Sequence, residues 1–200
     1  MKKIVIIGAS GHGKVVADIA RLNGYDEIVF LDDVNTGKCC GYPVVGNSEA
    51  IDTINEDIFV AIGNAEVRER IFNRLEEKNK SIATLIHPNA VIGDKVNIGV
   101  GTVVMAGAII NPCTEIGKGC IINTSSSVDH DNKIGNFVHV AVGAHLCGTV
   151  TVGSKTWIGA GATVINNTSI CSECIIGSGA VVVNKIDDSG TYIGVPASKK

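Results

Sequence analysis

The sequence has few aromatic residues, few prolines and no long apolar run. Only 4% of its 200 residues are aromatic and only four are proline, against 24 glycines. The longest apolar stretches are far too short to span a bilayer, so membrane insertion is not expected. A net charge of −3 gives no basic excess, so nucleic acid is not an expected partner. The first apolar run, Ile4–Ile7, ends in a glycine-rich loop and does not resemble a signal peptide, which predicts a cytoplasmic protein.

The seven cysteines are an odd number, and no secretory segment accompanies them, so reduced thiols are expected. Cys171 and Cys174 have the spacing of half a zinc ribbon, but no second pair of this spacing exists. We therefore expect no metal site there. The 45% of apolar residues is ample for a folded core.

Residues 1–80 alternate strand-like and helix-like patterns. An apolar stripe at helical spacing follows the first strand-like run, and Asn64 is suited to cap a second helix. The charged residues of that second helix, Arg68 among them, are expected on its solvated face. The order of elements predicts a small α/β domain with parallel strand pairing. Three short aliphatic runs are suited to buried strands: Ile4–Ile7, Glu27–Leu31 and Ile58–Ile62.

From residue 86 onward, an aliphatic residue recurs every six residues. Seventeen consecutive positions of this repeat, from Ile86 to Val182, are Ile, Leu or Val. The residue two places before each of them is nearly always small, and Asn132 is the exception. Glycine often follows the aliphatic residue, where we expect it to permit a sharp turn. A period of six predicts a β-solenoid with three hexads in each coil of eighteen residues.

His130 lies two positions after an interior aliphatic residue, so its side chain is expected to project outward. An amine or hydroxyl that attacks a thioester has to lose a proton, and histidine is suited to accept it near pH 7. The neighbouring Asp131 can fix the imidazole tautomer. Gly148, eighteen residues further on, is expected to stack beside His130 and leave open space. On spacing alone, a surface histidine with incidental acidic neighbours is an alternative explanation.

The glycine-rich loop spaces its glycines at positions 8, 11 and 13. An aliphatic run precedes it and a helical pattern follows, a context that turns backbone N–H groups toward a phosphate. Asp32 ends the second strand-like run, where a carboxylate often meets ribose hydroxyls. A tight turn without a ligand is the alternative explanation.

Six motifs in a fixed order carry a resemblance to a known family: Gly8–Gly13, Leu31–Asp33, Ala61–Asn64, Leu85–Pro88, Asn123–Asp131 and Gly194–Ala197. The chain is similar over its whole length to nucleotide-sugar N-acetyltransferases of the hexapeptide-repeat acyltransferase superfamily, which make bacillosamine-type sugars. It also resembles their relatives that O-acetylate sialic acid. The resemblance implies a Rossmann-like α/β domain over residues 1–80. It implies a left-handed parallel β-helix with a C-terminal tail over residues 81–200.

The resemblance also implies a reaction and its residues. A sugar amine, most directly the 4-amine of a UDP-4-amino-4,6-dideoxy sugar, would attack acetyl-coenzyme A, with His130 as general base assisted by Asp131. The family forms homotrimers with sites at subunit interfaces, and it implies no metal. The residues implied in binding the nucleotide-sugar are Ser10, Gly11, His12, Asp32, Asp33 and Gly63. The residues implied in binding acetyl-coenzyme A are His139, Gly148, Ala160 and Ser178.

Three alternatives stay open at this point. An O-acetyltransferase would use the same base to activate a hydroxyl of sialic acid or of another sugar. A zinc-dependent hydrase would use His130, His139 and His145 as metal ligands. A non-catalytic scaffold would bind a nucleotide-sugar without transferring an acetyl group.

Overall fold

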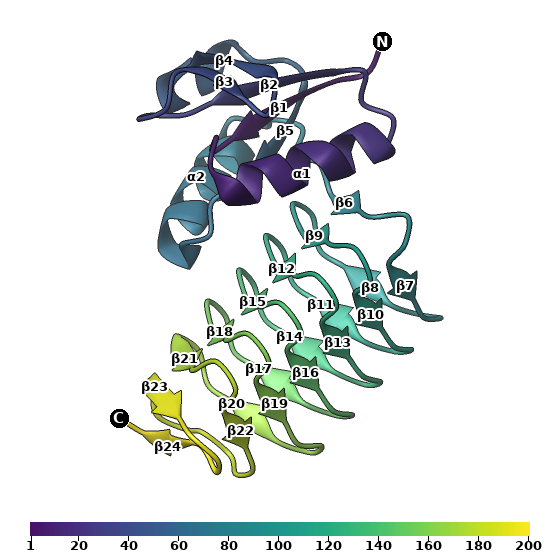
Figure 1. The fold of residues 1–200 in the computed structure, drawn as a ribbon, viewed down its shortest axis with the longest axis vertical. Helices are drawn as coiled ribbons and strands as arrows, with labels where there is room; N and C mark the ends of the chain where they lie inside the picture. The colour runs from purple at the N-terminus through teal and green to yellow at the C-terminus, as the bar shows by residue number, and fades with distance from the viewer. The chain divides into compact units, whose positions relative to one another are not determined.

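The computed structural model describes residues 1–200, which form two compact units, Met1–Pro88 and Asn89–Lys200 (Figure 1). The first unit therefore extends beyond residue 80, where the sequence pattern places the boundary. Residues 81–83 remain part of it because they continue its sheet. The N–H of Ile58 donates to the Ser81 carbonyl, and the N–H of Ala83 donates to the Ile58 carbonyl, each at 2.8 Å.

The first unit contains a five-stranded sheet in the order β3-β4-β2-β1-β5. As predicted, β1 pairs in parallel with both β2 and β5. A hairpin of β3 and β4, which the aliphatic pattern did not predict, extends the sheet. Neither helix is long and apolar enough to cross a membrane. The elements are β1 (Lys3–Ile7), α1 (Gly11–Leu22), β2 (Glu27–Leu31), β3 (Gly37–Cys39), β4 (Tyr42–Gly46), a 3₁₀ helix (Ser48–Thr53), β5 (Asp57–Val60), α2 (Ala65–Glu77) and β6 (Leu85–Ile86).

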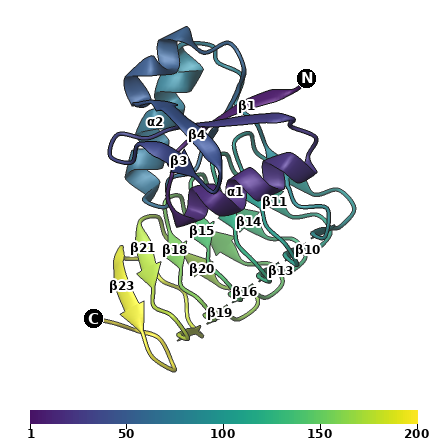
Figure 2. The same cartoon turned by 45° about the horizontal axis from the view of Figure 1, so that its top comes forward.

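The two helices of this unit pack on opposite faces of its sheet (Figure 2). Val29 and Leu31 of β2 form an apolar cluster with Leu75 of α2. Phe30 points to the other face because side chains alternate along a strand, and there it lies against Gly13 of α1. Both faces of the parallel strands are therefore buried, as their continuous aliphatic runs require.

Helix α2 begins at the predicted cap but buries a charge. The Asn64 side chain accepts a hydrogen bond from the N–H of Val67 at 3.0 Å, as its position predicted. The expectation that Arg68 lies on the solvated face is wrong, since this residue is only 1% exposed. Its guanidinium donates to the carbonyls of Ile62 and Gly63 at 2.8 Å. Arg68 thus supplies hydrogen-bond donors to the backbone carbonyls of the loop between β5 and α2.

The second unit is a stack of short strands in three parallel sheets (Figure 1). One sheet contains β7 (Val91–Ile92), β10 (Ile109–Ile110), β13 (Ser127–Val128), β16 (His145–Leu146), β19 (Thr163–Val164) and β22 (Val181–Val182). Another contains β8 (Asn97–Ile98), β11 (Glu115–Ile116), β14 (Lys133–Ile134), β17 (Thr151–Val152) and β20 (Ser169–Ile170). The last contains β9 (Val103–Val104), β12 (Ile121–Ile122), β15 (His139–Val140), β18 (Trp157–Ile158), β21 (Cys174–Ile176), β23 (Gly190–Ile193) and the antiparallel β24 (Ser198–Lys199).

The strand register confirms the coil of eighteen residues. Ile110 pairs with Val128, and Val128 pairs with Leu146, each eighteen residues further on. The repeated aliphatic residues from Val104 to Val182 are at most 4% exposed, so they fill the interior. Ile92 is 37% exposed because β7 is the edge strand of its sheet. The sheets form the β-solenoid that the repeat predicts, as the left-handed parallel β-helix that the resemblance implies.

The glycines that follow the aliphatic residues have a different role from the expected one. Gly117 and Gly135 do not adopt positive φ angles. A Cβ atom at Gly135 would instead lie 2.6 Å from the backbone nitrogen of Ser154 in the next coil. These glycines allow neighbouring coils to approach closely. The positive φ angles that turn the chain recur two residues later, at every sixth residue from Lys95 to Gly179.

Candidate active site

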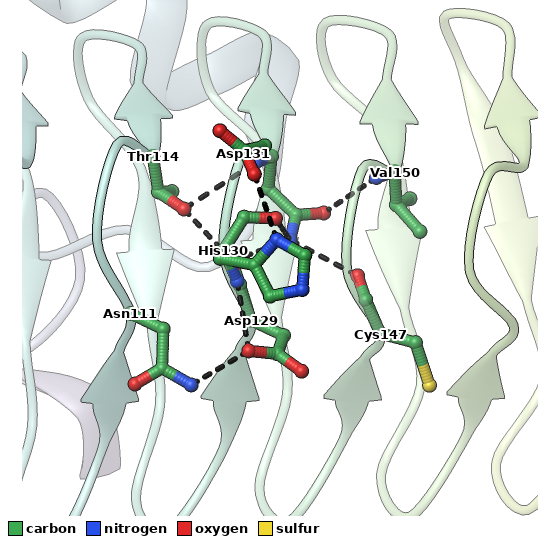
Figure 3. A network of polar contacts seen from close by, with 8 residues as sticks. Asn111, Thr114, Asp129, His130, Asp131, Cys147 and Val150 are labelled. Atoms are coloured by element: carbon green, nitrogen blue, oxygen red, sulfur yellow. Dashed lines mark hydrogen bonds and ion pairs between the residues drawn. The ribbon is translucent and has the colours of Figure 1, made fainter.

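His130 lies on the outside of the β-helix, in the turn between β13 and β14 (Figure 3). Its Nδ1 atom is 2.7 Å from the Asp131 carboxylate, and both side chains are more than half exposed. The hydrogen bond to Asp131 raises the pKa of His130, and the charge of Asp129 adds to this effect. When the Nδ1–H group donates a hydrogen bond to Asp131, Nε2 of the neutral ring carries no proton and its lone pair can accept one.

Gly148 lies directly beside this imidazole, as its place eighteen residues later predicted. A Cβ atom at this position would be 2.6 Å from both Cε1 and Nε2 of His130. Any side chain at Gly148 would therefore displace the imidazole. The Thr149 N–H donates to the His130 carbonyl at 2.9 Å, which joins the two turns. The small residue thus leaves Nε2 accessible, and Nε2 makes no hydrogen bond within the protein.

Two neighbours that the sequence analysis did not select support the His130 backbone. The Asp129 carboxylate accepts from the His130 N–H at 2.8 Å and from the Asn111 amide at 2.7 Å. The bond from Asn111 and then the bond from His130 lower the pKa of Asp129. Asn111 and Asp129 are eighteen residues apart, so the coil length was the signal that could have paired them.

The remaining histidines of the β-helix have separate partners. Nε2 of His139 accepts from the Asn123 amide at 3.0 Å, which places the His139 proton on Nδ1. The His139 ring lies 6.3 Å from that of Trp157, centroid to centroid. His145 lies in another sheet, with Nδ1 2.8 Å from the Ser127 hydroxyl. Within one chain, no three His, Cys, Asp or Glu side chains lie close enough to hold one metal, so His130, His139 and His145 of a single subunit do not converge.

Ala160 and Ser178 lie at a different corner of the β-helix from His130. Both are exposed in turns that follow β18 and β21, eighteen residues apart. The glycine after each has a positive φ angle, and nothing lies within 4 Å of where its Cβ would be. Within one chain, His130, Asp131 and Gly148 therefore come together, whereas Ala160 and Ser178 line a separate outer surface.

The α/β unit contains a pocket of about 420 Å³ at the carboxyl end of its parallel strands. Asp33 lines this pocket and accepts from the N–H and the hydroxyl of Ser48, at 2.8 and 3.0 Å. Arg70 and Arg74 of α2 line it as well. An open sheet binds ligands at this edge, so the pocket is a candidate nucleotide site.

Asp32 lines the same pocket, but its carboxylate is already engaged by the backbone. It accepts from the N–H groups of Ala9 at 2.7 Å, Val34 at 2.9 Å and Asn35 at 2.7 Å. Partial burial acts to raise the pKa of Asp32, but these bonds outweigh it and lower the pKa. Asp32 thus fixes the glycine-rich loop against the loop after β2, a role the sequence analysis did not assign.

The other residues implied in nucleotide-sugar binding do not line this pocket. Ser10 is the exposed N-terminal cap residue of α1 but makes no side-chain cap bond, and Gly11 is the first helical residue. The carbonyl of the exposed Gly63 accepts from Arg68. Burial, and secondly the charge of Arg68, lower the pKa of His12 to about 4. The buried Nε2 atom of His12 has no hydrogen-bond partner.

Comparisons with known proteins support this combination of units. The family described as the PglD N-terminal domain matches residues 3–75. A UDP-N-acetylbacillosamine N-acetyltransferase from Bacillus subtilis (strain 168) is 37% identical over 106 residues. That match spans 50% of this chain and 49% of the relative, so about half of the curated protein is matched.

Solved structures match over the whole chain. The acetyltransferase domain of PglB from Neisseria gonorrhoeae FA1090, in complex with acetyl coenzyme A, is 40% identical with a TM-score of 0.96. That match covers 100% of this chain and 99% of the other. PerB from Caulobacter crescentus, in complex with CoA and GDP-perosamine, is 37% identical with a TM-score of 0.95. It covers 100% of this chain and 98% of its own.

Proposed function

We propose that this chain, which belongs to the family of nucleotide-sugar N-acetyltransferases, transfers an acetyl group to the 4-amine of a UDP-4-amino-4,6-dideoxy sugar. The observation that carries the reaction type is the imidazole of His130, bound to Asp131 through Nδ1 and with Nε2 accessible beside Gly148. The donor in this proposal is acetyl-coenzyme A, the molecule bound to the PglB domain.

His130 accepts the proton of the attacking amine at Nε2, so that the nitrogen keeps a lone pair for the new bond. Asp131 stabilises the imidazolium that forms and holds the ring in the tautomer that leaves Nε2 unprotonated beforehand. Acetyl-coenzyme A supplies the thioester carbonyl that the amine attacks, and its thiolate is the leaving group. Gly148 keeps the approach to Nε2 open, and backbone N–H groups near it are suited to stabilise the oxyanion.

The nucleotide part of the substrate fits the α/β unit. The N-terminus of α1, with Ser10, Gly11 and His12, presents backbone N–H groups suited to phosphate. Asp33 keeps lone pairs beyond those that Ser48 uses, so it is the carboxylate best placed to bind a ribose or base group. Asp32 and Gly63 shape the loops around this site. PerB is bound to a GDP-sugar, and the choice of UDP for this chain is part of the proposal.

We also propose a homotrimer with its active sites between subunits. The proposed base and the proposed coenzyme A contacts Ala160 and Ser178 lie at different corners of one β-helix. Three copies around an axis would bring one corner of each chain to another corner of its neighbour. His139, on the sheet face that ends at the second corner, would then face the acetyl end of the donor. We expect the trimer to act in the cytoplasm, where acetyl-coenzyme A is made.

The test is replacement of His130 with Ala in a thiol-release assay. Turnover should fall at least ~100-fold, the lower range for losing a general base, while binding of acetyl-coenzyme A is retained. Unchanged turnover would contradict the assigned role.

A panel of acceptors tests the substrate with the wild-type protein. We expect release of thiol with UDP-linked 4-amino sugars in preference to their GDP-linked counterparts. Acetylation of free sialic acid would favour the O-acetyltransferase alternative. Binding of a nucleotide-sugar without any acetyl transfer would favour the scaffold.

A further inference from the structure

We propose that the buried side chain of Asn132 is a positioning residue that holds His130 over Gly148. The inference rests on the proposed role of His130 as general base. Asn132 breaks the repeat, because its place in the hexad is nearly always filled by a small residue. The residue is fully buried beneath the turn that carries His130 and Asp131.

Three of the other polar residues at this place in the repeat follow one rule, whereas Ser126 and Thr168 donate only within their own turn, to the carbonyls of Asn123 and Asn166. The Thr102 hydroxyl donates to the carbonyl of Gly117, fifteen residues on, and accepts from the N–H of Cys120, eighteen residues on. Thr114 makes the same two bonds, and so does Thr156. A hydroxyl has one hydrogen to donate, so this pair of bonds uses it fully. These three threonines therefore link their coil to the next one, and their hydroxyls make no hydrogen bond within their own turn.

Asn132 makes the same two bonds to the next coil and adds bonds within its own turn. Its amide donates to the Cys147 carbonyl at 3.0 Å, and its oxygen accepts from the Val150 N–H at 3.1 Å. The same NH₂ group also reaches the carbonyls of Asp129 at 2.6 Å and His130 at 3.3 Å. Only an amide, with two hydrogens and an acceptor, can join both coils and the turn in this way.

The residues that Asn132 joins lie on both sides of the proposed base. Asp129 and His130 belong to the turn that carries the imidazole, whereas Cys147 and Val150 flank Gly148 in the next coil (Figure 3). The side chain thus fixes the distance between the imidazole and the glycine that keeps it accessible. A shift of about 1 Å in such a group is enough to lower a rate by up to ~100-fold.

The variant Asn132→Thr separates the two functions of the amide. Threonine can retain the bonds to the Cys147 carbonyl and the Val150 N–H, as Thr102, Thr114 and Thr156 do in their coils, but leaves the turn carbonyls without this donor. We expect kcat to fall about tenfold, while KM for acetyl-coenzyme A changes less than about twofold. The looser turn weakens the bond between His130 and Asp131. The pKa of His130, followed by NMR, should therefore move down toward its ordinary value.

The matched control is Thr102→Val, which removes the same two inter-coil bonds in a coil that does not carry His130. It should lower the melting temperature and leave kcat and the His130 titration unchanged. If Asn132→Thr also changes only the melting temperature, the positioning role is overturned. Asn132→Cys is a second variant, because Cys120 fills the equivalent place with its Sγ 3.1 Å from the Gly135 carbonyl. The NMR titration needs no activity, so it tests this inference even if the proposed reaction is wrong.

Discussion

In the β-helix unit the strands from β7 to β22 pair at a constant interval of eighteen residues, whereas in the α/β unit the interval between partners varies. Ile109, Ser127 and His145 form one such column. In the α/β unit, β1 pairs with β2, which follows it, and with the more distant β5. In the β-helix, counting residues along the sequence therefore predicts which side chains are neighbours. In the α/β unit, the strand order must be known before neighbours can be assigned.

The two units also shift the pKa of a histidine in opposite directions. His130 is exposed beside a carboxylate, which raises its pKa. His12 is partly buried near the Arg68 guanidinium, and this burial lowers its pKa to about 4. The β-helix thus presents a histidine that can exchange protons with a substrate near neutral pH. The α/β unit keeps its histidine neutral at the same pH.

The largest effect is expected from breaking the close approach of two coils. In Gly135→Val the new Cβ would lie 2.6 Å from the backbone nitrogen of Ser154, which cannot move without shifting the next coil. We expect a loss of about 3 kcal/mol or more in the free energy of unfolding, or no folded protein. Chemical denaturation measures this loss.

Gly143→Ala is the matched change at a turn position of the same unit. Gly143 has a φ angle of +61°, and nothing lies within 4 Å of its would-be Cβ. The loss should be about 1–2 kcal/mol, the strain of a left-handed residue. Equal losses at both glycines would contradict the distinction between close approach and turning.

The periodic unit could be predicted from the sequence much further than the α/β unit. A fixed interval of six gave the coil, the interior residues and the neighbours His130 and Gly148. It did not give the reason for the glycines, since close approach and turning both favour glycine. In the α/β unit the hairpin of β3 and β4 contains no long aliphatic run from which it could be predicted. Arg68 can be buried because loop carbonyls accept hydrogen bonds from its guanidinium, which a charge pattern does not show.

The polar contacts of the candidate site were less predictable than its location. Asn132 stood out as the exception to the small residues, but its four bonds depend on a side-chain orientation that the pattern does not fix. Asp32 was expected to face a ribose because it ends a strand. In the structure its carboxylate instead accepts from backbone N–H groups of two loops, which only the folded chain brings together.

An effect smaller than that of Gly135→Val is expected from the pH dependence of His12. Its pKa falls from 6.5 to about 4 on folding, so the unfolded chain binds the proton more tightly in that range. Stability contributed by neutral His12 is therefore present above pH 6.5 and is lost as the pH falls toward 4. The shift corresponds to about 3 kcal/mol at most, at 1.36 kcal/mol per pKa unit.

Denaturation at pH 7 and pH 4.5 measures this loss against the variant His12→Gln. Glutamine does not titrate, so the variant should lose less stability than the wild type over the same interval. The carboxylates with lowered pKa values, Asp32 among them, contribute equally to both proteins and cancel in the comparison. An identical loss in both proteins would show that His12 is not the neutral, partly buried group that the structure indicates.

The smallest effect is expected where the perturbed histidine is exposed. Asp131→Asn removes the carboxylate that raises the pKa of His130, and asparagine tolerates the φ angle of +57° at this position. The pKa of His130 should fall, so the acid limb of the kcat/KM profile moves to lower pH. The plateau should fall less than ~10-fold, because solvent screens the exposed pair. Asp131→Glu keeps a carboxylate and should leave the limb nearer its original pH. An acid limb that stays in place in Asp131→Asn would mean that another group, and not the pair of His130 and Asp131, controls the proton transfer.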